Sequence, residues 1–287
     1  MRYLIAKIIA ATAIGAALLT AAGIATVPTV RHAASGWWNN PEGLPALPED
    51  PRIHYETGGS EYARTVAGLL PAALAQVEAV HGRPFRQPVT IGVYITPEAF
   101  VAANGLGDPR SVGMTFLGRV MLSPALFSRQ RQRLPALLTH ELSHAHLGSW
   151  MSQLGVWRLP QWFKEGLAVM VSGGGGAEGV SESQASDAIR RGDHIAPVTS
   201  NSLLNLGVIR YAQSPEIPDT SFRTLMAYRQ AGMFVMFLHD TDPASFGRMM
   251  DAILDDRSFA EAVTTGSLTC RRCGCALHRL NQRLNDW

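Results

Sequence analysis

Apolar positions in the first half of the chain follow two different periods. Over 61–80 they recur every three or four residues, which predicts an amphipathic helix that Pro71 kinks or breaks. The β-branched stretch 88–95 predicts a buried strand, and the Thr-Pro pair at 96–97 supplies the cap and first turn of a short helix after it. One or two further strands are expected over 114–124. The pattern therefore predicts a small mixed sheet with helices in the N-terminal half.

Helical periods dominate the remainder of the chain. One helix is expected between Pro135, which suits a first helical turn, and Gly148, which suits the position after a helix end. A second is expected from Pro160 to Val171, and the glycine run 173–176 ends it as a loop. Further helices are predicted over 183–191, 222–239, 242–255, 258–263 and 276–284, with a loop over 193–221. The predicted fold class is α+β, in which an N-terminal sheet is followed by a central helix and a helical C-terminal subdomain.

The N-terminus carries an uncharged apolar run from Ile8 to Val30, preceded by Arg2 and Lys7. The run is long enough to cross a bilayer, and its small residues also suit a cleaved signal peptide. Residues 1–30 are therefore either a signal peptide or a signal-anchor helix, and an uncleaved segment would make the membrane a partner. In both cases the positive charges before the run place the rest of the chain outside the cytoplasm.

The next segment, 31–54, contains several Pro, Gly and Asn residues without any period. It is expected to be a linker to a domain that spans 55–287. Trp37 and Trp38 lie in this linker. They either mark a membrane interface, where Trp is enriched, or cap the core of the folded domain.

Charge and cysteine content narrow the classes of function. The chain has 25 basic and 23 acidic residues, and the basic ones are scattered, so it has no footprint for nucleic acid. Cys270, Cys273 and Cys275 lie close together, near His278. Outside the cytoplasm they predict one disulfide and one remaining thiol, which could also join two chains. Metal binding by the three cysteines with His278 is the alternative.

The predicted central helix carries the most specific chemistry. His140, Glu141 and His144 form H-E-x-x-H, the zinc-hydrolase signature. Residues four apart share a helix face, so the two imidazoles can bind one ion, whereas Glu141 is turned about 100° away and suits a general base. By the same geometry His146 lies off the metal-facing side. A catalytic zinc site also needs a third protein ligand and leaves one position for water.

Glu165, in the next predicted helix, is the candidate third ligand. It lies 21 residues after His144, and two antiparallel helices can bring such positions face to face. A glutamate at a helix start would otherwise favour a solvated first turn. Trp162, Phe163 and the glycine after Glu165 instead indicate a buried helix that another backbone approaches closely. Glu165 is therefore predicted to bind the metal.

The segments His140–His144 and Trp162–Ala168 together resemble the gluzincin metallopeptidases. The resemblance is to the bacterial peptidase MA-like families and, more distantly, to the gluzincin aminopeptidases. It implies a zincin-like fold, one Zn²⁺ held by the two histidines and Glu165, and the Glu of H-E-x-x-H as general base. It extends over about residues 55 to 265, although only the two motifs are specific. The G-x-M-E-N motif of the aminopeptidases is absent, so that specificity is not expected.

Gluzincins commonly use Tyr or His to stabilise the oxyanion of the tetrahedral intermediate. Tyr228, 63 residues after Glu165, is the candidate by resemblance to the aminopeptidases. A half-buried core tyrosine is the alternative for Tyr228, and Tyr211, His194 and His239 compete for the role.

These features predict a zinc metallopeptidase that acts on peptides or proteins outside the cytoplasm, either membrane-anchored or secreted. The predicted strand Arg119–Ser123 would offer its edge to an extended peptide, unless it is an interior strand. The alternative function is a catalytically inactive zinc-binding envelope module that binds another protein. The intact Glu141 argues against this alternative, because a structural zinc site needs no general base.

Overall fold

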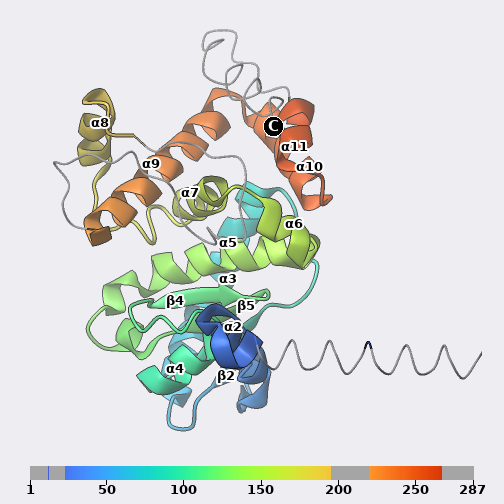
Figure 1. Ribbon diagram of the computed structural model, residues 1–287, viewed down its shortest axis with the longest axis vertical. Coiled ribbons are helices and arrows are strands. Elements are labelled where there is room, and N and C mark those ends of the chain that lie inside the picture. Colours follow the sequence, from blue (N-terminus) through green and yellow to red (C-terminus); the bar gives the residue numbers. More distant parts are fainter. Residues whose placement is uncertain (1–11, 13–22, 195–219, 267–287) are drawn as a thin grey trace, which may run out of the picture.

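A computed structural model describes residue 12, residues 23–194 and residues 220–266. It shows a mixed α+β protein in which helices cover both faces of a small sheet and then form a helical C-terminal half (Figure 1). The predicted α+β class is confirmed. The predicted helix 276–284, the cysteines Cys270, Cys273 and Cys275, and His278 lie outside the described residues.

In the part of the chain that the structure describes, the sheet has five strands, and it is mixed. The strands are β1 (Ala46–Leu47), β2 (Asp50–Tyr55), β3 (Thr90–Val93), β4 (Gly113–Phe116) and β5 (Arg119–Leu122). Their order is β1-β2-β3-β5-β4, in which β2, β3 and β5 are parallel and both edge strands are antiparallel to their neighbours. The predicted strand Arg119–Ser123 therefore corresponds to the interior strand β5, which ends at Leu122, and the edge on this side of the sheet belongs to β4.

Helices make up most of the remaining described chain. They are α2 (Pro28–Trp38), α3 (Ser60–His81), α4 (Pro97–Ala103), α5 (Leu134–Trp150), α6 (Gln153–Arg158), α7 (Gln161–Val171), α8 (Glu182–Arg190), α9 (Thr220–Thr241), α10 (Pro243–Leu254) and α11 (Phe259–Gly266). Short 3₁₀ turns are η1 (Pro41–Gly43), η2 (Pro124–Phe127) and η3 (Arg131–Arg133). The helix α3 passes through Pro71 without ending and closes at Gly82, which adopts a left-handed conformation (φ 79°).

Alternation of side chains along β5 explains the layers. Val120 and Leu122 are buried in the main core with α3 and α5, whereas Met121 packs on the opposite face with α4. The helix α2 lies against α4, where the Ser35 hydroxyl donates to the main-chain oxygen of Ala102 (2.8 Å). The sheet thus separates α3 and α5 from α4 and α2 (Figure 1).

The prediction of a linker over 31–54 is wrong. This segment holds most of α2, all of η1 and β1, and most of β2. Ile53 of β2 is fully buried and pairs with Ile91 of β3, so the segment is part of the domain. A strand with one fully buried residue gives almost no period, and its partner lies far along the chain.

Trp37 and Trp38, at the end of α2, are 61% and 79% exposed. They therefore do not cap the core, which was one of the two predicted roles. Within the ranges 23–194 and 220–266, no helix is long and apolar enough to cross a membrane. Most of the apolar run Ile8–Val30 lies outside these ranges.

Two glycines allow α7 and α9 to pack against each other. A Cβ on Gly166 would lie 2.5 Å from the main-chain oxygen of Ala231, and a Cβ on Gly232 would lie 2.4 Å from Cγ1 of Val169. A larger residue at either position would push the helices apart. This close contact brings Tyr228, one turn before Gly232, towards the face of α7 that carries the metal-binding motif.

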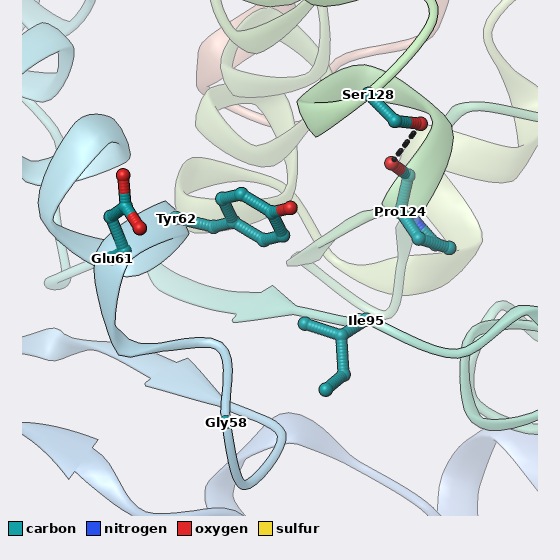
Figure 2. A pocket seen from close by; sticks show the side chains of 6 residues that line it. All are labelled: Gly58, Glu61, Tyr62, Ile95, Pro124 and Ser128. Carbon is teal, nitrogen blue, oxygen red and sulfur yellow. Dashed lines mark hydrogen bonds between the residues drawn. The ribbon is translucent and has the colours of Figure 1, made fainter.

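A cavity of about 330 Å³ lies at the carboxyl ends of the parallel strands (Figure 2). Its lining comes from the first turn of α3 and the segments after β2, β3 and β5: Gly58, Glu61, Tyr62, Ile95, Pro124 and Ser128. None of these residues belongs to the predicted metal ligands, so the cavity is separate from the site described next.

Candidate metal centre

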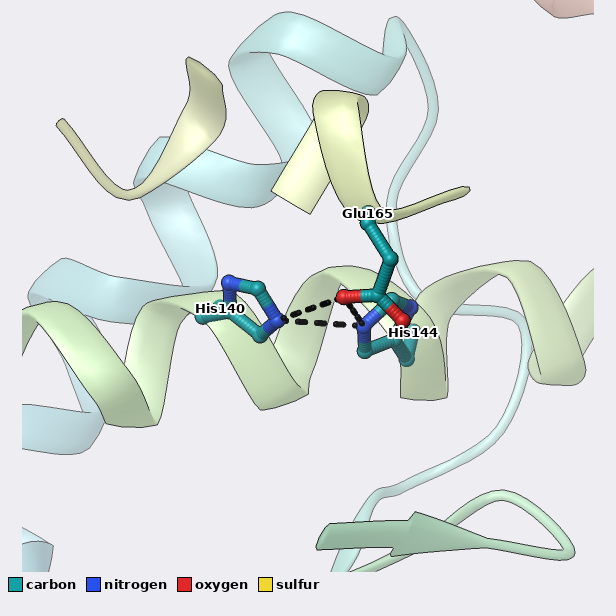
Figure 3. Close-up of side chains that lie close together, drawn as sticks. All are labelled: His140, His144 and Glu165. Atoms are coloured by element: carbon teal, nitrogen blue, oxygen red, sulfur yellow. Dashed lines mark hydrogen bonds and ion pairs between the residues drawn. The ribbon is translucent and has the colours of Figure 1, made fainter. Parts of the chain in front are cut away.

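Three side chains from two helices converge on one point (Figure 3). His140 and His144 lie one turn apart on α5, and Glu165 comes from α7. Nε2 of His140 lies 3.3 Å from Oε2 of Glu165 and 3.2 Å from Nε2 of His144. Nε2 of His144 lies 3.5 Å from the same carboxylate oxygen. The structure thus assembles the three predicted ligands into a largely buried group that could hold a metal ion.

The spacing of these three atoms fits a tetrahedral zinc ion. Ligand distances of about 2.0–2.1 Å at a tetrahedral angle place neighbouring ligand atoms about 3.3 Å apart. The separations of 3.2, 3.3 and 3.5 Å lie on either side of that value. Two imidazoles and one carboxylate are also a donor set of catalytic zinc sites, which keep a fourth position open.

The group needs a positive charge at its centre. Nδ1 of His140 lies 2.8 Å from the main-chain oxygen of Gly175, so this nitrogen is assigned the proton and Nε2 presents a lone pair. Lone pairs of imidazole and a buried carboxylate then face one another, which is unfavourable unless a cation or a proton lies between them.

The pKa values of two ligands reflect this need for positive charge. Burial alone would lower the pKa of His140, but the hydrogen bond and charge of Glu165 and the charge of Glu141 raise it above its ordinary value. Burial would raise the pKa of Glu165, yet the two histidines lower it strongly. A bound divalent cation would supply the same positive charge as a second proton, on Nε2 of His140. The cation and this proton would therefore compete for the site.

The glycine run after α7 orients His140. Besides accepting the hydrogen bond from His140, Gly175 donates its N–H to the Ser172 hydroxyl (2.9 Å). A Cβ on Gly175 would lie 2.6 Å from the main-chain oxygen of Ala136 in α5, and a Cβ on Gly176 would lie 3.0 Å from Cε1 of His140. A side chain on Gly175 would thus collide with α5, and one on Gly176 would press against the His140 ring, so both positions favour glycine.

Gly176→Ala is expected to weaken zinc binding by about 10- to 100-fold, the usual effect of disturbing a ligand's supporting contacts. Gly176 has φ +83° and faces the His140 ring. The matched control is Gly173→Ala, because Gly173 has φ +66° but nothing within 4 Å of its added Cβ. Both variants should lose about 1–2 kcal/mol of unfolding free energy through backbone strain. Titration with a competing chelator should show a change in zinc affinity for Gly176→Ala alone; equal changes in both variants would contradict the orienting role.

Glu165 is oriented from its own helix. Nε2 of Gln161, one turn earlier on α7, donates to Oε1 of Glu165 (2.5 Å), which leaves Oε2 for the metal. This role of Gln161 was not predicted from the sequence. The His144 ring stands edge-on to the His140 ring, with centroids 4.9 Å apart. Within the described part of the chain, no contact orients Nδ1 of His144.

Glu141 is buried beside the ligand group and is held by the edge strand β4. The Thr115 hydroxyl lies 2.7 Å from Oε2 of Glu141 and 2.9 Å from its main-chain oxygen. A Cβ on Gly113 would lie 3.0 Å from Oε1 of the same carboxylate. Glu141 is thus separate from the three ligands, as the helical spacing predicts, and sits between α5 and the edge of the sheet.

Tyr228, on α9, is half-buried near both carboxylates of the site. The negative charge of Glu165, burial, and the charge of Glu141 raise the pKa of its hydroxyl well above the ordinary value. The hydroxyl therefore stays protonated and can donate a hydrogen bond. Of its competitors, His194 is exposed, His239 pairs with Asp240 (2.8 Å), and Tyr211 lies outside the described residues.

His146 is buried on the rear of α5, away from the ligands, in a hydrogen-bonded chain that the sequence did not reveal. Nε2 of His146 lies 2.9 Å from the main-chain oxygen of Arg83, and Nδ1 of His146 lies 2.9 Å from Nδ1 of His81. Nε2 of His81 lies 3.0 Å from the Ser143 hydroxyl. Neutral histidines satisfy every link if His146 donates to Arg83, His81 to His146, and Ser143 to His81. This series of hydrogen bonds fixes the rotation of α5 against the end of α3.

His81 is expected to make the metal-free protein acid-sensitive. Burial, and then the nearby histidines, hold its pKa well below the ordinary value of about 6.5. At pH values below about 6.5, the His81 side chain therefore binds a proton in the unfolded chain but not in the folded chain. This contribution to the unfolding free energy is therefore complete above about pH 6.5 and is lost as the pH falls towards the folded pKa, by up to about 1.4 kcal/mol per pH unit. Urea unfolding with a chelator should show a shallower acid loss in His81→Gln, but an unchanged loss in His194→Gln, which alters an exposed histidine.

Comparison of the chain with models of protein families, with characterised proteins and with solved structures finds no match. The family resemblance carried by the two motifs thus stays a prediction, and the function is argued from the geometry of the site.

Proposed function

We propose that this protein is a zinc-dependent metallopeptidase of the gluzincin type, with a zincin-like fold, that hydrolyses peptide bonds outside the cytoplasm. The position of Glu141 carries the proposal. It is a buried carboxylate beside three ligand atoms at tetrahedral spacing, yet it is bound to β4 and is not one of the ligands. A purely structural or vestigial metal site needs no such group, which disfavours the alternative of an inactive zinc-binding envelope module.

Each residue of the site has a distinct task in the proposed reaction. His140, His144 and Glu165 would hold the zinc, which supplies Lewis-acid polarisation of the scissile carbonyl and acidifies water. Glu141 accepts a proton from the attacking water and returns it to the leaving amine. The hydroxyl of Tyr228, kept protonated by its surroundings, donates to the oxyanion of the tetrahedral intermediate.

The free edge of β4 supports an extended polypeptide as the substrate. Among the described strands, β4 pairs with β5 alone. The N–H and C=O groups along its outer edge are therefore not paired with another described strand. Thr115 of this strand contacts the carboxylate of Glu141, which places the edge beside the proposed general base. A peptide added along β4 as a further strand would therefore pass the catalytic group with its backbone extended.

Metal analysis and peptide cleavage test the proposal together. The full chain, purified in detergent, is analysed for bound metal and incubated with a peptide library before and after zinc removal by a chelator. We expect one zinc per chain, cleavage that stops on chelation, and recovery on adding zinc. Zinc without cleavage would favour the binding module instead, and a chain that binds no metal would overturn both functions.

A further inference from the structure

The helix α2 carries an outward stripe of apolar side chains. Val30, Ala34, Trp37 and Trp38 recur at helical spacing, so they fall within an arc of about 100° on the helix. Both indoles are mostly solvent-exposed, and Val30 is 40% exposed. Exposed Trp is unusual on a water-facing helix, because each indole could otherwise bury a large apolar surface.

The opposite side of α2 is fixed to the domain. A Cβ on Gly36 would lie 2.6 Å from Cα of Gly105, and a Cβ on Gly107 would lie 2.2 Å from Nδ1 of His32. Backbone and ring are in such close contact that α2 cannot rotate to bury its stripe without losing this packing. We call Val30, Ala34, Trp37 and Trp38 the docking face.

The sequence before α2 indicates what covers the docking face. The uncharged run Ile8–Val30 ends inside the first turn of α2, so the run leads into the docking face without a polar linker. No acidic residue precedes Glu42, whereas Arg2, Lys7 and Arg31 are basic. An apolar run that is soon followed by paired Trp is the order found where a chain leaves a bilayer, because Trp is enriched at the membrane interface.

We propose that the docking face lies on the surface of a phospholipid bilayer, with Trp37 and Trp38 among the lipid headgroups. Trp37 is about 10 Å along the helix from Val30, so a tilted α2 keeps both in the interfacial layer. A Cβ on Gly105 would lie 2.5 Å from the Phe116 ring of β4, so only one layer of contacts separates α2 from the proposed substrate edge. The docked domain would thus present that edge at a fixed height above the membrane.

This inference rests on residues 1–30 acting as an uncleaved signal-anchor, which is one of the two predictions from the sequence, but not on the metal chemistry of the proposed function. The experiment uses the full chain in vesicles of phosphatidylcholine and phosphatidylglycerol, with acyl chains either plain or brominated near the headgroup. Bromine quenches the fluorescence of an indole that it contacts within the bilayer. We compare the wild type with the double variant Trp37→Ala/Trp38→Ala and with Trp157→Phe, which removes a partly exposed indole from α6.

Brominated lipid should quench the wild type and Trp157→Phe, whereas emission from the double variant should not depend on the lipid. Circular dichroism should show the same helix content in all three proteins, because the replaced indoles of the double variant contribute little to the core. Equal quenching of wild type and double variant would overturn the docking face while leaving membrane attachment intact. A chain that does not float with vesicles would overturn the placement itself. The same proteins are also treated with a chemical cross-linker. If the wild type forms a cross-linked dimer that the double variant does not form, and lipid quenches neither protein, the docking face would bind a second copy of the chain instead.

Discussion

Glu141→Gln is expected to retain zinc and to lose peptide hydrolysis by about 10²- to 10⁴-fold, the usual contribution of a general base. The substitution keeps the shape of the side chain and its contact with the Thr115 hydroxyl, but removes the oxygen that accepts a proton. Because Glu141 is not among the three ligands, the metal content should remain that of the wild type. Rates on the best-cleaved library peptide, together with metal analysis of the same samples, check both halves of this result.

The matched control for this substitution is Glu182→Gln, in the exposed first turn of α8. It makes the same chemical change far from the ligand group, and the rate should stay at the wild-type level. Full activity in Glu141→Gln would rule out Glu141 as the base. Loss of zinc together with activity would mean that Glu141 supports the metal, so that the division of roles among the carboxylates would have to be redrawn.

Some helix ends that Pro or Gly marks could be predicted from the sequence, whereas the expected end of α5 at Gly148 is wrong, because this helix continues to Trp150. Pro160 immediately precedes α7 and the glycine run follows it, while Pro135 occupies the first turn of α5, because Pro and Gly act on their own backbone. The strand β2 could not be predicted, because it begins with Asp50 and Pro51, which are residue types that strands disfavour. Its stability comes from pairing with β3, which lies far along the chain. For α6, the Ser152 hydroxyl that accepts from the N–H of Gly155 (3.0 Å) is a capping signal that sequence reasoning overlooked.

Some features of the candidate site could likewise be predicted from the sequence, and others could not. The spacing of His140 and His144 is a property of one helix, so its consequence follows from the sequence. His140 is oriented by the main-chain oxygen of Gly175. Every residue has a main-chain oxygen, so this partner could not be predicted from the residue type. Gln161 is different, because Gln and Glu at positions i and i+4 of a helix form a recognisable pair. The Thr115 contact depends on β4 lying at the edge of the sheet, which only the topology reveals.

Glu165→Ala is expected to weaken zinc binding more than any change to a residue that only orients a ligand. It removes the one anionic ligand and leaves two imidazoles, whereas Gln161→Ala leaves the carboxylate in place but frees it to rotate. For Gln161→Ala we expect a loss of about 10- to 100-fold in affinity. Competition with a chromophoric chelator should therefore rank the proteins as wild type, Gln161→Ala and Glu165→Ala, in order of falling affinity.

Gln76→Ala is the control that separates orientation from stability. The Gln76 amide donates to the main-chain oxygen of Val171 (2.6 Å), so it holds the far end of the same helix without touching the carboxylate. Its loss should cost about 1 kcal/mol of unfolding free energy and leave zinc affinity unchanged. If Gln76→Ala weakened binding as much as Gln161→Ala, the position of α7 as a whole would control the site. If Glu165→Ala bound zinc as tightly as the wild type, Glu165 would not be a ligand, because the two imidazoles alone cannot replace its charge at the centre of the group.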